Sequence, residues 1–166
     1  MTLKYKKANL NINDIALYFI KKGISENRPM SNKKLQKLLY YSQAWSLVLN
    51  KKILFNDPIE AWVHGPAIRS IYKKYKEFGF NPIVSDALKN CKLNLDKETL
   101  ELLNEVWRVY GQYDAQYLEL LTHSEKPWQE ARKNLEYNDI SDQVISIDSM
   151  FNYYSVLKNA HSQKEA

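Results

Sequence analysis

Apolar side chains recur about every three to four residues along most of the chain, a spacing typical of helices that bury one face. The clearest case begins after Ser31, a good N-cap residue, and ends near Asn50. The sequence therefore predicts a mainly helical protein. The apolar stripe of this helix comprises Leu35, Leu38, Leu39, Ser42, Trp45, Val48 and Leu49.

The same spacing predicts further helices on both sides of this one. Asn13 is expected to cap the first helix and Gly23 to end it, while Asp96 and Ser146 are expected to cap later helices. Pro66 is suited to the first turn of another, because its fixed φ angle already matches a helix. The predicted helices are residues 13–22, 66–78, 96–110 and 114–123, a short helix from Pro127, and 146 to about 160.

Two short apolar runs follow the helix that begins after Ser31. Residues 53–55 and 59–63 are separated by Asn-Asp-Pro, which indicates a small β-hairpin. Residues 81–95 are expected to form a loop with short turns. The predicted fold class is therefore mainly α: a single compact multi-helix domain with a small β-hairpin between the second and third helices.

The length of 166 residues fits one domain. We expect an N-terminal extension at residues 1–9, the helical domain at 10–160 and a flexible tail at 161–166. The one cysteine, Cys91, excludes an internal disulfide and a cysteine-rich zinc site. No apolar run reaches the roughly 18 residues of a membrane span, and the basic N-terminus leads into no apolar signal core. The protein is thus expected in the cytoplasm, without a membrane partner.

Charge divides the chain into two unlike halves. Residues 1–76 carry 15 Lys and Arg against 4 Asp and Glu, a net charge of +11, whereas residues 77–166 carry 9 against 15, a net charge of −6. A basic half can attract nucleic acid or an acidic protein surface, or it can complement the acidic half within one fold. The predicted helix after Ser31 is too apolar for a nucleic-acid recognition helix, so nucleic acid is the less favoured partner.

Two histidines and a glutamate are the candidates for catalysis. His64, His123 and Glu125 could act as acid and base, as in a hydrolase, or bind a metal ion. Their spacing matches no known metal motif, so no metal or other cofactor is expected. We interpret His64 as ordering a turn, His123 as ending a helix, and Glu125 as stabilising the N-terminus of the next helix. Cys91 is interpreted as a small filler rather than a nucleophile.

Three sequence segments, taken together, are more specific than any of these features. They are LQKLLYYSQAW at 35–45, DPIEAWVHGP at 57–66 running on to IYKKY at 71–75, and LTHSEKPWQEAR at 121–132. In this order they resemble the Panacea domain, also called the SocA-like antitoxin domain, over about residues 10–157. Two features depart from the family pattern. His64 replaces a residue that is commonly tyrosine, and only about ten residues precede the match, too few for the DNA-binding domain that some members carry.

The resemblance implies the antitoxin of a two-gene toxin–antitoxin system. Such antitoxins bind their toxin directly, the toxin is expected from the adjacent gene, and these gene pairs are often found on prophages and other mobile elements. One member acts instead as an adaptor that delivers its toxin to a cytoplasmic protease, so a proteolysis adaptor is an alternative, as is a nucleic-acid-binding protein. No enzymatic activity is implied.

The motif residues are expected to hold the scaffold rather than to contact the toxin. Gly65 and Pro66 would join a strand to a helix, Trp128 would anchor the core, and Arg132 would pair with a carboxylate. The residues expected to bind the toxin from an exposed basic surface are Lys37, Tyr40, Lys73, Lys74 and Lys76. The expected scaffold residues are Leu35, Leu38, Leu39, Trp45, Glu60, Trp62, Gly65, Pro66, Tyr72, His123, Glu125, Pro127, Trp128 and Arg132.

Overall fold

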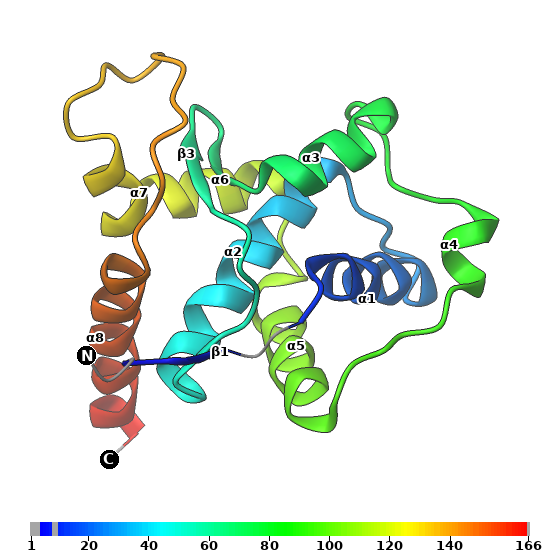
Figure 1. Cartoon of the computed structure of the whole chain (residues 1–166), viewed down its shortest axis with the longest axis horizontal. Coiled ribbons are helices and arrows are strands. Elements are labelled where there is room, and N and C mark those ends of the chain that lie inside the picture. Colours follow the sequence, from blue (N-terminus) through cyan, green and yellow to red (C-terminus); the bar gives the residue numbers. More distant parts are fainter. Residues whose placement is uncertain (1–3, 8–9, 166) are drawn as a thin grey trace.

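A central helix organises the fold in the computed structural model, which describes residues 4–7 and 10–165. This helix, α2 (Asn32–Leu49), packs against α1 (Ile12–Ser25), α5 (Lys97–Tyr110), α6 (Ala115–His123) and α8 (Ile147–Glu165), which surround it in Figure 1. Because neighbours cover it on several sides, most of its side chains are buried, polar ones included. The mainly helical fold class predicted from the sequence is confirmed.

Capping residues fix where several helices begin. The side chain of Ser31 accepts a hydrogen bond from the Lys34 amide at the start of α2. Asp96 does the same for the Thr99 amide at the start of α5, at 2.8 Å. These two N-caps were predicted from the sequence and are confirmed. Each satisfies an amide that the first helical turn leaves without a backbone partner.

The first helix is longer than the sequence predicted. Its cap is Asn11 rather than Asn13, and it continues through Gly23 to Ser25. Gly23 therefore does not end the helix. A Cβ atom at this position would lie 2.7 Å from the carbonyl oxygen of Arg28, so glycine allows the following loop to fold back closely onto α1.

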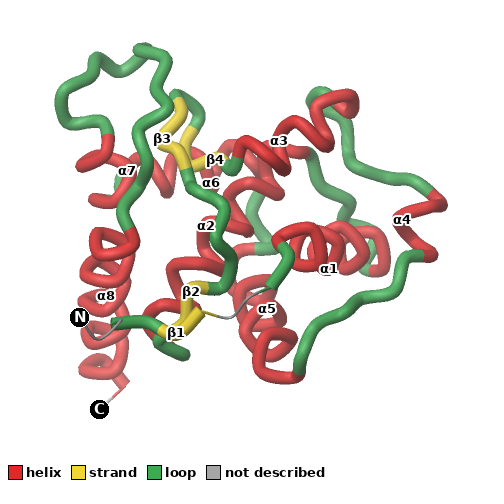
Figure 2. The backbone as a smooth tube through the Cα atoms, in the orientation of Figure 1, coloured by secondary structure: helices red, strands yellow, loops and turns green. Residues whose placement is uncertain are grey.

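The strands form two separate two-stranded sheets, drawn in yellow in Figure 2. In one, β1 (Lys6–Lys7) runs parallel to β2 (Lys52–Ile53). In the other, β3 (Glu60–Trp62) and β4 (Gly65–Ala67) form a tight antiparallel hairpin. A hairpin between the second and third helices is thus confirmed, but the predicted pairing of 53–55 with 59–63 is wrong. The turn lies at Val63 and His64 instead of residues 56–58, and Gly65, at φ 99°, supplies the backbone conformation that the hairpin needs.

Pro66 lies within β4 and does not begin a helix, which corrects another prediction. The chain continues to Ile68, whose amide donates to the Gln36 side chain at 2.7 Å, and only then begins α3 (Arg69–Tyr75). A single 3-10 turn, η1 (Lys76–Phe78), follows α3. The side chain of Gln36 thus ends the hairpin and sets the start of α3.

The remaining elements complete the domain. A short helix, α4 (Asp86–Asn90), lies in the segment predicted as a loop, and α7 (Lys126–Ala131) matches the short helix predicted near Pro127. The last helix, α8, continues through Glu165, past its predicted end near residue 160. The predicted N-terminal extension, 1–9, is described only at residues 4–7, and Ala166 also lies outside the described residues.

Candidate functional site

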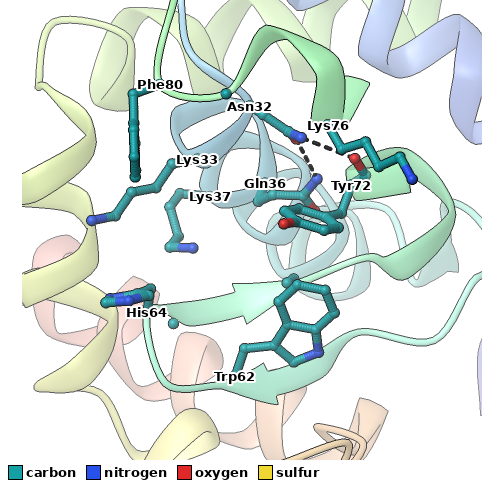
Figure 3. A pocket seen from close by; sticks show the side chains of 12 residues that line it. Asn32, Lys33, Gln36, Lys37, Trp62, His64, Tyr72, Lys76 and Phe80 are labelled. Carbon is teal, nitrogen blue, oxygen red and sulfur yellow. Dashed lines mark hydrogen bonds between the residues drawn. The ribbon is translucent and has the colours of Figure 1, made fainter. Parts of the chain in front are cut away.

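A cavity of about 390 Å³ opens between α2, the β3–β4 hairpin and the segment from α3 to Phe80 (Figure 3). We call it the α2–hairpin pocket. Two of the three sequence segments that carry the family resemblance supply half of its lining residues, one through α2 and the other through the hairpin and α3. Its lining residues are Asn32, Lys33, Gln36, Lys37, Trp62, His64, Gly65, Ala67, Tyr72, Lys76, Gly79 and Phe80.

Aromatic side chains give the pocket an apolar wall and rim. The rings of Trp62 and Tyr72 pack edge to face with their centroids 4.9 Å apart. Phe80 stands on the other side of the opening in Figure 3 and is 95% exposed. Exposed aromatic rings beside a hollow are typical of surfaces that bind another protein. Phe80 was not predicted as a site residue, because it lies between the predicted helix at 66–78 and the predicted loop at 81–95.

Lys37 is a buried amine at this pocket. Only 2% of the residue is exposed, and its Nζ donates a hydrogen bond to the Pro66 carbonyl oxygen at 3.0 Å. Burial lowers the pKa of Lys37 to about 7, against an opposing effect of Glu119. Its hydrocarbon stem crosses Gly65, where a Cβ atom would lie 2.7 Å from Lys37 Cε and 2.9 Å from Thr122 Oγ1. Glycine at position 65 therefore allows both the turn and this close approach.

A carboxylate holds two other basic side chains at one edge of the pocket. Glu119 on α6 pairs with Lys33 and, at 3.0 Å, with Nδ1 of His64. Burial works against ionisation of Glu119, but the hydrogen bonds from Lys33 and His64 outweigh it and lower the pKa of this carboxyl. Glu119 is thus held as an anion by two partners other than Lys37.

A chain of buried amides holds the rear wall of the pocket. Gln36 donates to Asn32 Oδ1 at 2.9 Å, and Asn32 in turn donates to the Tyr72 carbonyl oxygen at 3.0 Å. These hydrogen bonds, dashed in Figure 3, tie α3 to α2. The frame around the pocket is therefore set by buried polar contacts as well as by apolar packing.

The third motif segment fastens the hairpin to the rest of the domain. Trp128 is 6% exposed, stacks on His123 with ring centroids 4.0 Å apart, and donates from Nε1 to the Trp62 carbonyl oxygen at 2.9 Å. Arg132 donates to the Ala61 carbonyl oxygen at 2.8 Å. Trp128 is thus buried and joins α7 to the β3–β4 hairpin.

Arg132 does not have the partner that the sequence suggested. Among the described residues its guanidinium pairs with no carboxylate. Besides Ala61, it donates to the carbonyl oxygens of Glu136, Tyr137 and Asp139 in the loop after α7. A planar group with several donors can bind several carbonyls at once, which orders this loop against β3.

The three catalytic candidates do not assemble into one site. His64 contacts Glu119, and His123 stacks on Trp128. The carboxylate of Glu125 makes no cap bond to α7, which corrects its predicted role, and instead accepts from the hydroxyls of Tyr41 and Tyr154 at 2.8 and 2.9 Å. Burial raises the pKa of Glu125 to about 7. In the part of the chain that the structure describes, no group of three or more potential ligands fits a metal ion.

The predicted toxin-binding residues divide into two groups. Tyr40 is fully buried against Tyr41 and Tyr154, and Lys37 is nearly so; the prediction that both lie on an open surface is wrong. Helical spacing placed them off the main apolar stripe, but α2 has neighbours on that side as well. By contrast, Lys73, Lys74 and Lys76 are exposed on α3 and η1. Lys76 lines the pocket, whereas Lys74 Nζ donates to Asn13 Oδ1 on α1 at 2.7 Å.

Comparison with known proteins identifies the class. The family model described as "Antitoxin SocA-like, Panacea domain" matches residues 35–129, more than half of the chain, so the chain belongs to this family. That range includes most of the α2–hairpin pocket. The family match supports an antitoxin role.

One particular relative is Antitoxin SocA of Caulobacter vibrioides (strain NA1000 / CB15N). It is 29% identical over 124 residues, which cover 69% of this chain and 66% of the relative. The match thus spans just under two thirds of that protein. No solved structure matches significantly. Within the described residues, none of the helices has the length and apolar character needed to cross a membrane.

Proposed function

We propose that this protein neutralises a cognate protein toxin, encoded by the adjacent gene, by direct stoichiometric binding in the cytoplasm. The observation that carries the proposal is the family match over residues 35–129. Neutralisation in this account requires no catalysis. In support, His64, His123 and Glu125 are each engaged in separate structural contacts.

The α2–hairpin pocket and the adjoining basic surface are the proposed docking face. Lys73, Lys74 and Lys76 give this face positive charge, while Tyr72 and Phe80 give it exposed aromatic area. Rim charges mainly raise the association rate, and aromatic anchors supply much of the binding energy at protein interfaces. An acidic toxin surface would complement this face.

Co-expression tests the proposal directly. The adjacent gene alone should arrest growth, and co-expression of this chain should restore growth and yield a stable complex on purification. A harmless neighbour, or a toxic neighbour that forms no complex, would refute direct neutralisation. Toxin half-life separates blocking from delivery to a protease: a blocker leaves the half-life unchanged or lengthens it, whereas an adaptor shortens it.

A further inference from the structure

The Lys37 ammonium group has fewer partners than its chemistry allows. An ammonium group can donate three hydrogen bonds, and the described residues provide one acceptor, the Pro66 carbonyl oxygen. None of the described carboxylates forms an ion pair with it. Glu119, the carboxylate that opposes the lowering of its pKa, is held by Lys33 and His64. A buried cation without a counter-ion is costly, and a cation that lines a cavity can obtain one from a ligand.

The surroundings of Lys37 indicate what such a ligand is. Lys37 lines the same pocket as the aromatic side chains of Trp62 and Tyr72, with Phe80 at the rim. Lys76 on η1 also lines the pocket, so a second lysine forms part of its wall. This combination suits an anionic group on a short apolar stem, as in an acidic side chain.

We propose that the α2–hairpin pocket receives an Asp or Glu side chain of the toxin. Its carboxylate accepts a hydrogen bond from Lys37 Nζ, and its neighbours in the toxin pack against Trp62, Tyr72 and Phe80. The inference rests on the proposed function and adds the chemistry by which the partner is recognised. A protein segment is the favoured occupant because the exposed side chains of Lys76 and Phe80 both line the pocket.

Toxin binding through Lys37 should depend on pH. A bound carboxylate stabilises the charged amine and so raises its pKa above the value of about 7 in the free protein. Complex formation then takes up a proton, and affinity falls by up to about tenfold per pH unit above neutrality. The other titratable groups that face or influence Lys37 are Lys33 on α2, His64 in the hairpin turn, Lys76 on η1, and Glu119 and His123 on α6.

Two matched variants of α2 test this inference. Lys37→Met removes the amine and keeps an unbranched apolar stem of similar length. Lys34→Met is the control, because Lys34 is a partly buried lysine on the same helix that also donates to a backbone carbonyl, that of Gly111 at 2.6 Å. It does not line the pocket. Dissociation constants with the purified toxin are measured by calorimetry between about pH 7 and 9, and folding is checked by thermal unfolding.

We expect Lys37→Met to weaken toxin binding by about tenfold or more near neutral pH and to flatten its pH dependence. Lys34→Met should keep the wild-type affinity and pH profile. Wild-type affinity and pH profile in a folded Lys37→Met variant would overturn the inference and leave the proposed function standing. Failure of the wild-type chain to bind the toxin at all would overturn both. A toxin variant with the contacting Asp or Glu changed to its amide should lose no further affinity for Lys37→Met.

Discussion

Trp128 connects the third motif segment to the hairpin through a ring stack and a hydrogen bond. Truncation by Trp128→Ala removes both and leaves a large cavity, so we expect the free energy of unfolding to fall by about 3–5 kcal/mol. Trp128→Phe keeps a ring to stack on His123 but loses the hydrogen bond to the Trp62 carbonyl oxygen. It should therefore lower the free energy of unfolding by less than Trp128→Ala does. Urea denaturation measures both. Equal stability of Trp128→Ala and wild type would show that Trp128 is not an anchor.

The buried carboxyl of Glu125 gives the protein a specific pH dependence of stability. Its pKa is raised from 4.5 to about 7, so between these values the folded state holds a proton that the unfolded state releases. The stabilisation is full below about pH 4.5 and is lost as pH rises through about 7, a change of about 3 kcal/mol.

Glu125→Gln should remove this contribution, and the exposed Glu136→Gln should retain it. Urea denaturation at about pH 4.5, 6 and 7.5 checks the difference. If Glu125→Gln keeps the wild-type dependence on pH, the carboxyl titrates normally in the folded protein.

At the scale of elements, the hairpin depends on Gly65 for two separate reasons. A side chain there meets both an unfavourable φ of 99° and the close approach of Lys37 and Thr122. We expect Gly65→Ala to cost about 1–3 kcal/mol in backbone strain and a comparable amount from overpacking. Gly79→Ala is the control, because φ is also positive there but no atom lies within 4 Å of the added Cβ. Equal losses of stability in the two variants would exclude the packing contribution.

The elements also show what could be predicted from the sequence. Ser31 and Asp96 act locally, through a side chain and an amide three residues away, so the starts of α2 and α5 were predictable. The strand pairings could not be predicted, because they depend on residues distant in the sequence. β2 pairs with β1, far earlier in the chain, and Gln36 on α2 sets the end of the hairpin. The prediction that Lys37 and Tyr40 are exposed was wrong for a similar reason. Their burial depends on the elements packed around α2.

At the scale of the whole molecule, the positive charge gathered beside the pocket should speed toxin association. Charge reversal by the double substitution Lys73→Glu and Lys74→Glu should lower the association rate constant by about tenfold at low salt, with a smaller effect at high salt. The double substitution Lys158→Glu and Lys164→Glu makes the same change in net charge on α8, and should leave the rate near wild type. Stopped-flow measurement compares them. If both double variants lower the association rate constant equally, the effect comes from net charge in general and not from charge at this face.

Titration of toxin activity with the purified chain tests the central claim most directly. Direct stoichiometric binding predicts that toxin activity falls in proportion to the added chain and reaches zero at a fixed molar ratio, at which all toxin elutes in the complex. Complete loss of activity at a small fraction of that ratio would indicate catalytic inactivation. Full toxin activity in the presence of excess chain would contradict neutralisation by binding.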